Sequence, residues 1–216
     1  IILYGVMVAT SVTVEKSNRS IEVLVTSVDA KYLLFGKVFA GATAAIVQIG
    51  LILASALIGY NINHTYWGDK LDMILKIPGS VLAGFAVFGI GGFLFYAFLY
   101  GAMGALVSKT EDINKSAGTL QMLIMIVYFV VMFQLPTPDS VVMKICSFLP
   151  FSSYSAMFVR IGMGSVTMAE IMTSAVILFV STFAAGWLAA KIYRMGTLRY
   201  GNPIKLTTAL KNLKNN

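Results

Sequence analysis

Residues 77–108 read IPGSVLAGFAVFGIGGFLFYAFLYGAMGALVS, without a charged side chain from end to end. Three further stretches share this property, residues 38–68, 116–138 and 171–190. An α-helix needs about 20 apolar residues to cross the hydrocarbon core of a bilayer, and each stretch can supply them. Residues 1–14 form a shorter fifth candidate. We therefore predict an all-α, polytopic membrane protein, a single transmembrane domain over residues 1–216, with spans at 1–14, 32–59, 79–106, 118–135 and 170–191.

The composition supports the same class. Hydrophobic residues make up 58% of the chain and charged residues only 12%. Soluble globular domains carry about 25% charged residues. A buried helical core in a soluble protein is the alternative, and this scarcity of charge disfavours it.

The net charge of the chain is +7, and the basic residues are distributed in a way that indicates its orientation in the membrane. If the five spans alternate in direction, twelve of the 16 basic residues fall on one side of the membrane and four on the other. Basic residues concentrate in cytoplasmic loops. This rule puts the Glu15–Lys37 segment, the loop at Lys109 and the C-terminal tail in the cytoplasm. The positive charge thus indicates orientation in a membrane, and we predict no nucleic-acid partner.

The chain opens inside an apolar run at Ile1, without an initiator methionine, a basic leader region or a small-residue cleavage site. A signal peptide would show the last two features. Five spans would also put the two ends on opposite sides of the membrane. We therefore expect a fragment of a longer protein, with at least one more span upstream. Cys146 is the single cysteine, so no disulfide can form within the chain.

The charged segment EKSNRSIEVLVTSVDAKYLLFGK, residues 15–37, separates the first two predicted spans. Ile21, Leu24, Val25 and Val28 recur at the i, i+3, i+4 and i+7 spacing of one helix face. The spacing predicts a short amphipathic helix over residues 17–28. Such a helix suits the groove of a soluble partner or the membrane surface. A solvated loop whose apolar stripe rests on lipid is the simpler interpretation, and it stays open.

Two short apolar segments follow the fourth span, Val141–Leu149 and Ser155–Met163. Both are too short to cross a bilayer, so we predict re-entrant or interfacial half-helices at the outer end, from which Arg160 can cap or snorkel.

The span at 79–106 is rich in glycine, which indicates either close helix packing or a flexible pore-lining helix. The glycines concerned are Gly84, Gly89, Gly91, Gly92, Gly101 and Gly104.

These segments carry a family resemblance. Glu15-Lys16, the Ser-x-Glu-x-Leu core at Ser20–Leu24, and Gly36-Lys37 resemble the cytoplasmic loop of type-2 ABC exporter permeases. The motifs Leu149–Ser153, Lys191–Gly196 and Tyr200-Gly201 resemble the end of the sodium-efflux (NatB-like) branch of that family. The similarity covers essentially all 216 residues in the expected order and spacing.

The resemblance implies the second to sixth spans of a six-span permease half in a prokaryotic cell membrane. It also implies a second permease half (homo- or heterodimer) and ATP-binding subunits that hold ATP and Mg²⁺. This chain has no G-x-x-x-x-G-K-[ST] phosphate loop, so it binds no cofactor of that kind by itself. The charged segment would be the helix that couples the ATPase to the spans. Its contact residues would be Glu15, Lys16, Arg19, Ser20, Ile21, Glu22, Leu24 and Val25.

Polar residues inside the spans are candidates for a translocation path. They are Thr43, Gln48, Ser55, Gln121, Tyr128 and Gln134. Helix packing or interhelical hydrogen bonding explains each of them equally well. An exporter permease is the preferred function, and a non-transporting mechanical or sensing subunit coupled to the same ATPase is the alternative. The sequence shows no paired nucleophile and base, which argues against an intramembrane enzyme. One histidine and one cysteine are too few to form a metal cluster. The cargo is open between sodium and a hydrophobic compound.

Overall fold

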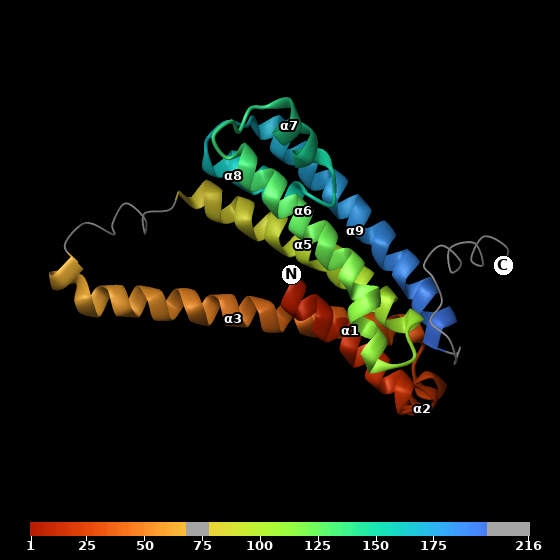
Figure 1. The fold of residues 1–216 in the computed structure, drawn as a ribbon. Helices are drawn as coiled ribbons and strands as arrows, with labels where there is room; N and C mark the ends of the chain where they lie inside the picture. The colour runs from red at the N-terminus through yellow and green to blue at the C-terminus, as the bar shows by residue number, and fades with distance from the viewer. Residues whose placement is uncertain (68–77, 198–216) are drawn as a thin grey trace.

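The computed structural model describes residues 1–67 and 78–197, which contain helices and no strand. The predicted all-α class is confirmed (Figure 1). The elements are α1 (Ile2–Ser17), α2 (Ser20–Ser27), α3 (Ala30–Trp67), α5 (Gly79–Leu106), the short 3₁₀ turn η2 (Thr110–Asp112), α6 (Ile113–Gln134), α7 (Val141–Phe148), α8 (Ser153–Gly162) and α9 (Met168–Thr197). The Tyr200-Gly201 motif and the basic tail that follows it lie outside the described residues.

Four of these helices, α3, α5, α6 and α9, are long and apolar enough to cross a membrane. They cover the predicted spans to within one residue, and three of them extend further: α3 continues to Trp67, α6 begins at Ile113 and α9 continues to Thr197. In α9, Glu170 and Lys191 bracket the uncharged stretch. At 1.5 Å per residue these two positions are about 32 Å apart along the axis, close to the ~30 Å hydrocarbon thickness. The charged ends of α9 therefore bracket one bilayer.

The predicted fifth span forms α1, which has 16 residues. It is therefore about 24 Å long, somewhat shorter than the hydrocarbon core. Gly5, Val8, Ala9 and Val12 are buried at the i, i+3, i+4 and i+7 positions of one face. This face packs mainly against α5, with further contacts to α3 and α6.

The central helix is α5, which packs against α1, α3, α6, α8 and α9. A Cβ atom on Gly104 would lie 2.5 Å from the carbonyl oxygen of Ala9 in α1, and one on Gly92 would overlap the Cβ of Tyr154 in α8. Non-bonded carbon atoms prefer separations of about 3.5–4.0 Å. The neighbouring helices therefore come this close because these two side chains are absent, which favours the packing interpretation of these glycines.

The two ends of the bundle carry different short helices (Figure 1). The α2 helix lies where α1 and α3 meet, and α7 and α8 lie at the opposite end. The positions of α7 and α8 agree with the predicted half-helices. The hydroxyl of Ser140 caps α7 by accepting a hydrogen bond from the Met143 amide at 3.2 Å. The α8 helix packs against both α5 and α7, so α7 and α8 together cover one end of the bundle.

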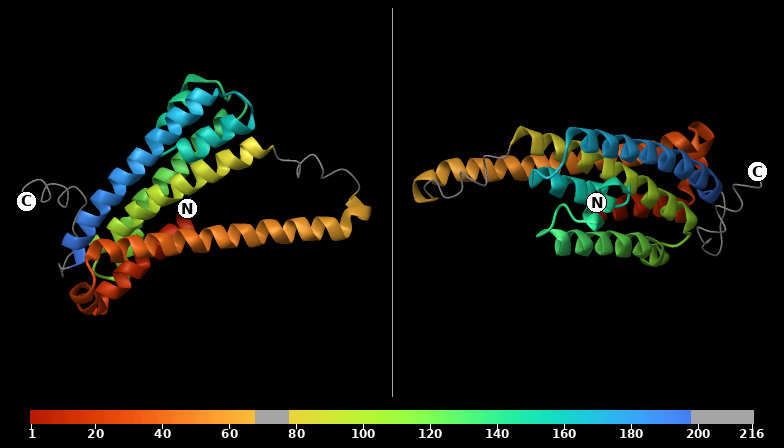
Figure 2. Two further views of the ribbon diagram at one scale, coloured as in Figure 1. Left: turned by 180° about the vertical axis from the view of Figure 1, so that it is seen from behind. Right: turned by 90° about the horizontal axis from the view of Figure 1, so that it is seen from above.

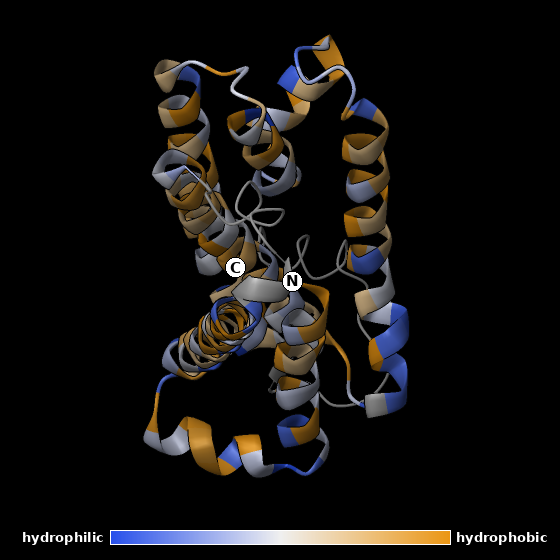
Figure 3. Cartoon of the chain, turned by 90° about the vertical axis from the view of Figure 1, so that its left-hand side faces the viewer, coloured by the Kyte–Doolittle hydropathy of each residue, from blue (hydrophilic) through white to orange (hydrophobic). Residues whose placement is uncertain are grey.

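The α3 helix diverges from the other long helices, as the left view in Figure 2 shows. In the first part of α3, Leu34, Val38 and Ala42 are buried. Side chains from Ile46 to Ile62 are largely exposed. The hydrophobic colour runs along the long helices and the hydrophilic colour gathers at their ends and connections (Figure 3). Exposed apolar surface of this kind is what a helix presents to lipid.

Candidate functional site

The chain turns sharply between α1 and α2. α1 continues through Ser17, and α2 begins at Ser20. Between them Arg19 has a φ of 57°, in the left-handed region that ends many helices. Its amide donates to the carbonyl of Lys16 at 3.1 Å. Glu15, Lys16 and Ser17 therefore belong to the last turn of α1. The helix predicted over 17–28 is shorter, because α2 runs from Ser20 to Ser27.

The orientation of α2 divides its predicted contact residues into two groups. Ile21 is fully buried in the core, whereas Val23 is 71% exposed. Residues of an α-helix are about 100° apart, so Val23 points away from the side that Ile21 occupies. Val25 is half-buried and Leu24 is 37% exposed. Ile21 and Val25 thus anchor α2 to the bundle, whereas Val28 lies beyond its end and is 41% exposed. The free face of α2 centres on Val23, which the periodicity did not identify.

The polar residues predicted around this helix lie on its accessible side. Arg19, Ser20 and Glu22 are exposed. The hydroxyl of Ser20 donates to the backbone carbonyl of Glu15 at 3.1 Å, which ties the start of α2 to the end of α1. The charge of Glu22 is therefore available at the same end of the molecule as the side chain of Val23.

Two side chains fix α1 to the C-terminal end of α5. The Lys16 ammonium is 1% exposed and donates to the Ala105 carbonyl at 2.8 Å. The Thr13 hydroxyl donates to the Gly104 carbonyl at 2.9 Å. The last carbonyls of a helix lack partners within it and carry partial negative charge, so a cation stabilises them. Lys16 lies beyond the apolar run of α1, and burial lowers its pKa to about 8. It points into the bundle, unlike the contact to a partner that the sequence suggested.

Glu15 joins α1 to α3 beside α2. Its carboxylate accepts a hydrogen bond from the ammonium of Lys37, which also donates to the Ser11 hydroxyl at 2.7 Å. The Lys37 and Glu15 side chains are 17% and 27% exposed, so water screens the pair only in part. We call Ser11, Glu15 and Lys37 the α1–α3 clamp, because they hold together the two helices that flank α2.

Three of the predicted path residues lie on α3. Thr43 donates to the carbonyl of Phe39 in its own helix at 2.9 Å. Gln48 accepts a hydrogen bond from the hydroxyl of Tyr4 in α1. Ser55 is exposed. The first two thus have local partners of the kind that ordinary helix packing provides.

The other three lie on α6. Gln134 accepts a hydrogen bond from the Ser140 hydroxyl at 2.7 Å and secures the turn to α7. Gln121 is half-buried. Tyr128 lines a largely apolar groove of about 530 Å³ between α1, α6 and α8. Because α3 and α6 do not pack against each other to any appreciable extent, the six residues do not form one site within the described part of the chain. Their role in transport stays a prediction.

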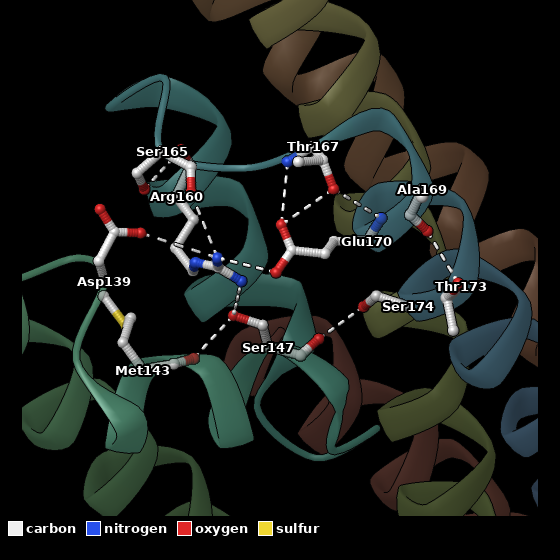
Figure 4. Close-up of polar contacts among 10 residues, drawn as sticks. All are labelled: Asp139, Met143, Ser147, Arg160, Ser165, Thr167, Ala169, Glu170, Thr173 and Ser174. Atoms are coloured by element: carbon white, nitrogen blue, oxygen red, sulfur yellow. Dashed lines mark hydrogen bonds and ion pairs between the residues drawn. The ribbon is translucent and has the colours of Figure 1, made fainter.

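A buried arginine joins the short helices at the opposite end (Figure 4). Arg160 of α8 is 1% exposed. Its guanidinium donates to Glu170 at 3.3 Å, to the Ser165 carbonyl at 3.2 Å and to the Ser147 hydroxyl at 3.4 Å. Asp139 lies 3.9 Å away as a second carboxylate. Arg160 therefore links α7, α8 and α9 and does not have the exposed position that snorkelling requires.

Part of this cluster has a sequence signal. Thr167 and Glu170 fit the S/T-x-x-E capping box at the start of α9. The Glu170 carboxylate accepts a hydrogen bond from the Thr167 amide at 2.9 Å, and the Glu170 amide donates to the Thr167 hydroxyl at 3.4 Å. The pattern places the carboxylate at the helix start. The contact between Arg160 and this carboxylate depends on tertiary packing, which the sequence pattern does not show.

Comparison with known proteins assigns the family. A family model described as ABC-2 family transporter protein matches residues 1–191. The chain belongs to the ABC-2 transporter family. It is 26% identical over 207 residues to the uncharacterized protein YhaP of Bacillus subtilis, a match that covers 94% of this chain and 49% of YhaP. It is 29% identical over 212 residues to the uncharacterized protein MJ1024 of Methanocaldococcus jannaschii, covering 97% of this chain and 49% of MJ1024.

The ABC-2 chain thus spans about half the length of these curated relatives. No solved structure matches it. The family, together with four helices of spanning length, supports a multi-pass membrane component of an ABC transporter. The resemblance to ABC exporter permeases is confirmed at this family level, whereas the sodium-efflux branch and the numbering of the spans stay predictions.

Proposed function

We propose that this chain is the membrane-spanning part of an ABC exporter permease, driven by a separate ATP-binding subunit. That subunit binds ATP and Mg²⁺, and a second permease half, identical or different, completes the pathway. The α2 end faces the cytoplasm of a prokaryotic cell. Family membership and the placement of α2 support this proposal.

The observation that carries the proposal is the free face of α2. Val23, which is 71% exposed, has the exposed polar residues Glu22 and Thr26 beside it. Burying a valine side chain completely is worth about 1.5–3 kcal/mol. A helix docks in the groove of a soluble partner through exposed apolar side chains, which Val23 and the partly exposed Leu24 supply here. The ATP-binding subunit is that partner.

The connections of α2 provide a route for movement. Two-residue turns join α2 to α1 and to α3, so displacement of α2 displaces both helices. The α1–α3 clamp keeps these two helices together, and Thr13 and Lys16 extend the connection to α5. Closure of the ATP-binding subunits then rocks the spans as packed units.

Copurification of the full-length protein with its cognate ATP-binding subunit tests the proposal. Val23→Asp is compared with Val141→Asp, because Val141 is 72% exposed but lies in α7 at the opposite end. Loss of about 1.5 kcal/mol of apolar burial weakens the association by roughly tenfold. We expect this for Val23→Asp and no change for Val141→Asp. If both variants associate as strongly as the wild type, α2 is not the docking helix.

Transport is tested in sealed vesicles with the same complex. ATP-dependent efflux of sodium or of a hydrophobic dye is measured, since these are the two proposed cargo classes. Efflux of either one supports the exporter. ATP turnover that Val23→Asp abolishes, without efflux of either cargo, would instead favour the mechanical or sensing subunit.

A further inference from the structure

One face of α9 changes in character from one end to the other. Its exposed residues recur at helical spacing and pass from aliphatic to aromatic to cationic. They are Val176, Val180, Phe183, Trp187, Lys191 and Arg194. The first four are 58%, 64%, 80% and 57% exposed. Because α9 has the length and hydropathy of a membrane span, the apolar part of this face lies against acyl chains.

The aromatic and the cationic residues of this face are in contact. The Lys191 ammonium lies 3.7 Å from the centroid of the Trp187 ring. Tryptophan concentrates where the hydrocarbon core meets the headgroups, and its ring face attracts cations. Lys191 is also about 12 Å along the axis from Phe183, the last fully apolar residue of the face. The contact therefore holds an exposed ammonium at headgroup depth.

The cations of α9 differ from Lys31 and Lys37 near α2, each of which has a carboxylate beside it. Lys37 pairs with Glu15, and Lys31 pairs with Asp29 at 3.6 Å. Within the described part of the chain, no ion pair joins Lys191 or Arg194 to a carboxylate. The sequence has no acidic residue after Glu170, whereas six basic residues follow from position 191 onward. Uncompensated cations next to a membrane span attract anionic lipid.

We propose that Trp187, Lys191 and Arg194 form a binding surface for the phosphate group of an anionic phospholipid. The acyl chains extend along Val180 and Phe183, and the phosphate reaches the two cations at the end of the same face. Continuity between the apolar and cationic parts of one exposed helix face favours a lipid as the occupant, because a lipid joins both chemistries in one molecule. The inference rests on the proposed function only for assigning this surface to the cytoplasmic leaflet.

The test is lipid binding to the purified full-length protein in detergent, measured by native mass spectrometry. Phosphatidylglycerol is titrated against phosphatidylcholine. We expect the wild type to bind the anionic lipid about tenfold more tightly, and Lys191→Gln combined with Arg194→Gln to abolish most of that preference. Lys115→Gln is the matched control, because Lys115 is an exposed cation already paired with Asp112 at 3.6 Å. It should keep the preference.

Two results would overturn the inference. The first is equal binding of both lipids by the wild type, or a preference that survives in the double variant. The second is displacement of the lipid by millimolar inorganic phosphate, which would show a phosphate site and not a lipid site. Trp187→Leu keeps the apolar character but removes the cation–π contact, so it should lower the preference in part. Copurification with the ATP-binding subunit is recorded for every variant, so that loss of lipid binding is separated from loss of docking.

Discussion

Replacing Gly104 by alanine is expected to destabilise the bundle through the backbone of α1. The new Cβ would lie 2.5 Å from the Ala9 carbonyl oxygen and 2.9 Å from the Ala9 Cα. Ordinary contact needs about 3.5 Å, so α1 must move away from α5 by about 1 Å. That displacement also lengthens the hydrogen bonds from Thr13 and Lys16 to α5, which are now 2.9 and 2.8 Å.

The magnitude follows from these contacts. Overpacking costs about 1–3 kcal/mol, and each weakened hydrogen bond costs about 0.5–1.5 kcal/mol. The higher helix propensity of alanine returns about 1 kcal/mol. The net loss in the free energy of unfolding is therefore about 1–5 kcal/mol for Gly104→Ala. The assay is denaturant unfolding in lipid–detergent micelles, followed by circular dichroism.

Gly118→Ala in α6 is the matched control for this prediction. No heavy atom lies within 4 Å of a Cβ built on Gly118. The same substitution there should raise the free energy of unfolding by about 0.5–1 kcal/mol through helix propensity alone. If Gly104→Ala proves as stable as Gly118→Ala, α1 does not approach α5 at Gly104 and the packing argument is wrong.

Three further predictions concern the charged groups. In a double-mutant cycle with Glu15→Gln and Lys37→Met, unfolding should show a favourable coupling energy of about 1 kcal/mol, and no coupling would mean that the α1–α3 clamp is absent. Arg160→Met should lower the free energy of unfolding by about 1–3 kcal/mol and Arg160→Lys by less, because the Ser165 carbonyl and the Ser147 hydroxyl lose their donor while the partly exposed Glu170 stays hydrated; equal stability of all three proteins would contradict the cluster. Burial lowers the pKa of Lys16 to about 8 in the folded protein, so the unfolded chain binds more protons above that pH. Stability should therefore rise as the pH increases from about 8 towards about 10, the ordinary lysine range, and Lys16→Met should remove this part of the rise; an unchanged pH profile would place Lys16 in water.

Much of the architecture follows from the distribution of charge along the sequence. The charge-free stretches predict α3, α5, α6 and α9 because a bilayer excludes unpaired charge over about 20 residues. The segments at Val141 and Ser155 are predicted as short helices for the same reason, since their apolar runs end too soon to span. Length and composition are local properties, and a single sequence shows them directly.

The details of the α2 region needed tertiary information. Helical periodicity finds the stripe of Ile21, Leu24 and Val25 but does not say what covers it. The structure buries Ile21 against the chain itself, which leaves Val23 as the outward residue. The left-handed turn at Arg19 has no glycine to signal it, so the sequence predicted that the second helix starts at residue 17 and not at Ser20. The partners of Lys16 and Arg160 come from distant helices and were not visible for the same reason.

Cysteine cross-linking between α2 and the ATP-binding subunit tests the central proposal most directly. Cys146 is the single cysteine of residues 1–216 and is replaced by serine, together with any cysteine elsewhere in the full-length protein. Single cysteines are then placed at Val23, at Ile21 and at Val141, and the complex is treated with a bifunctional thiol-to-amine reagent. The structure predicts efficient cross-linking from Val23, little from the buried Ile21 and none from Val141 at the opposite end. Cross-linking from Val141 but not from Val23 would show that the ATP-binding subunit meets the other end of the bundle, and that α2 is not the coupling helix.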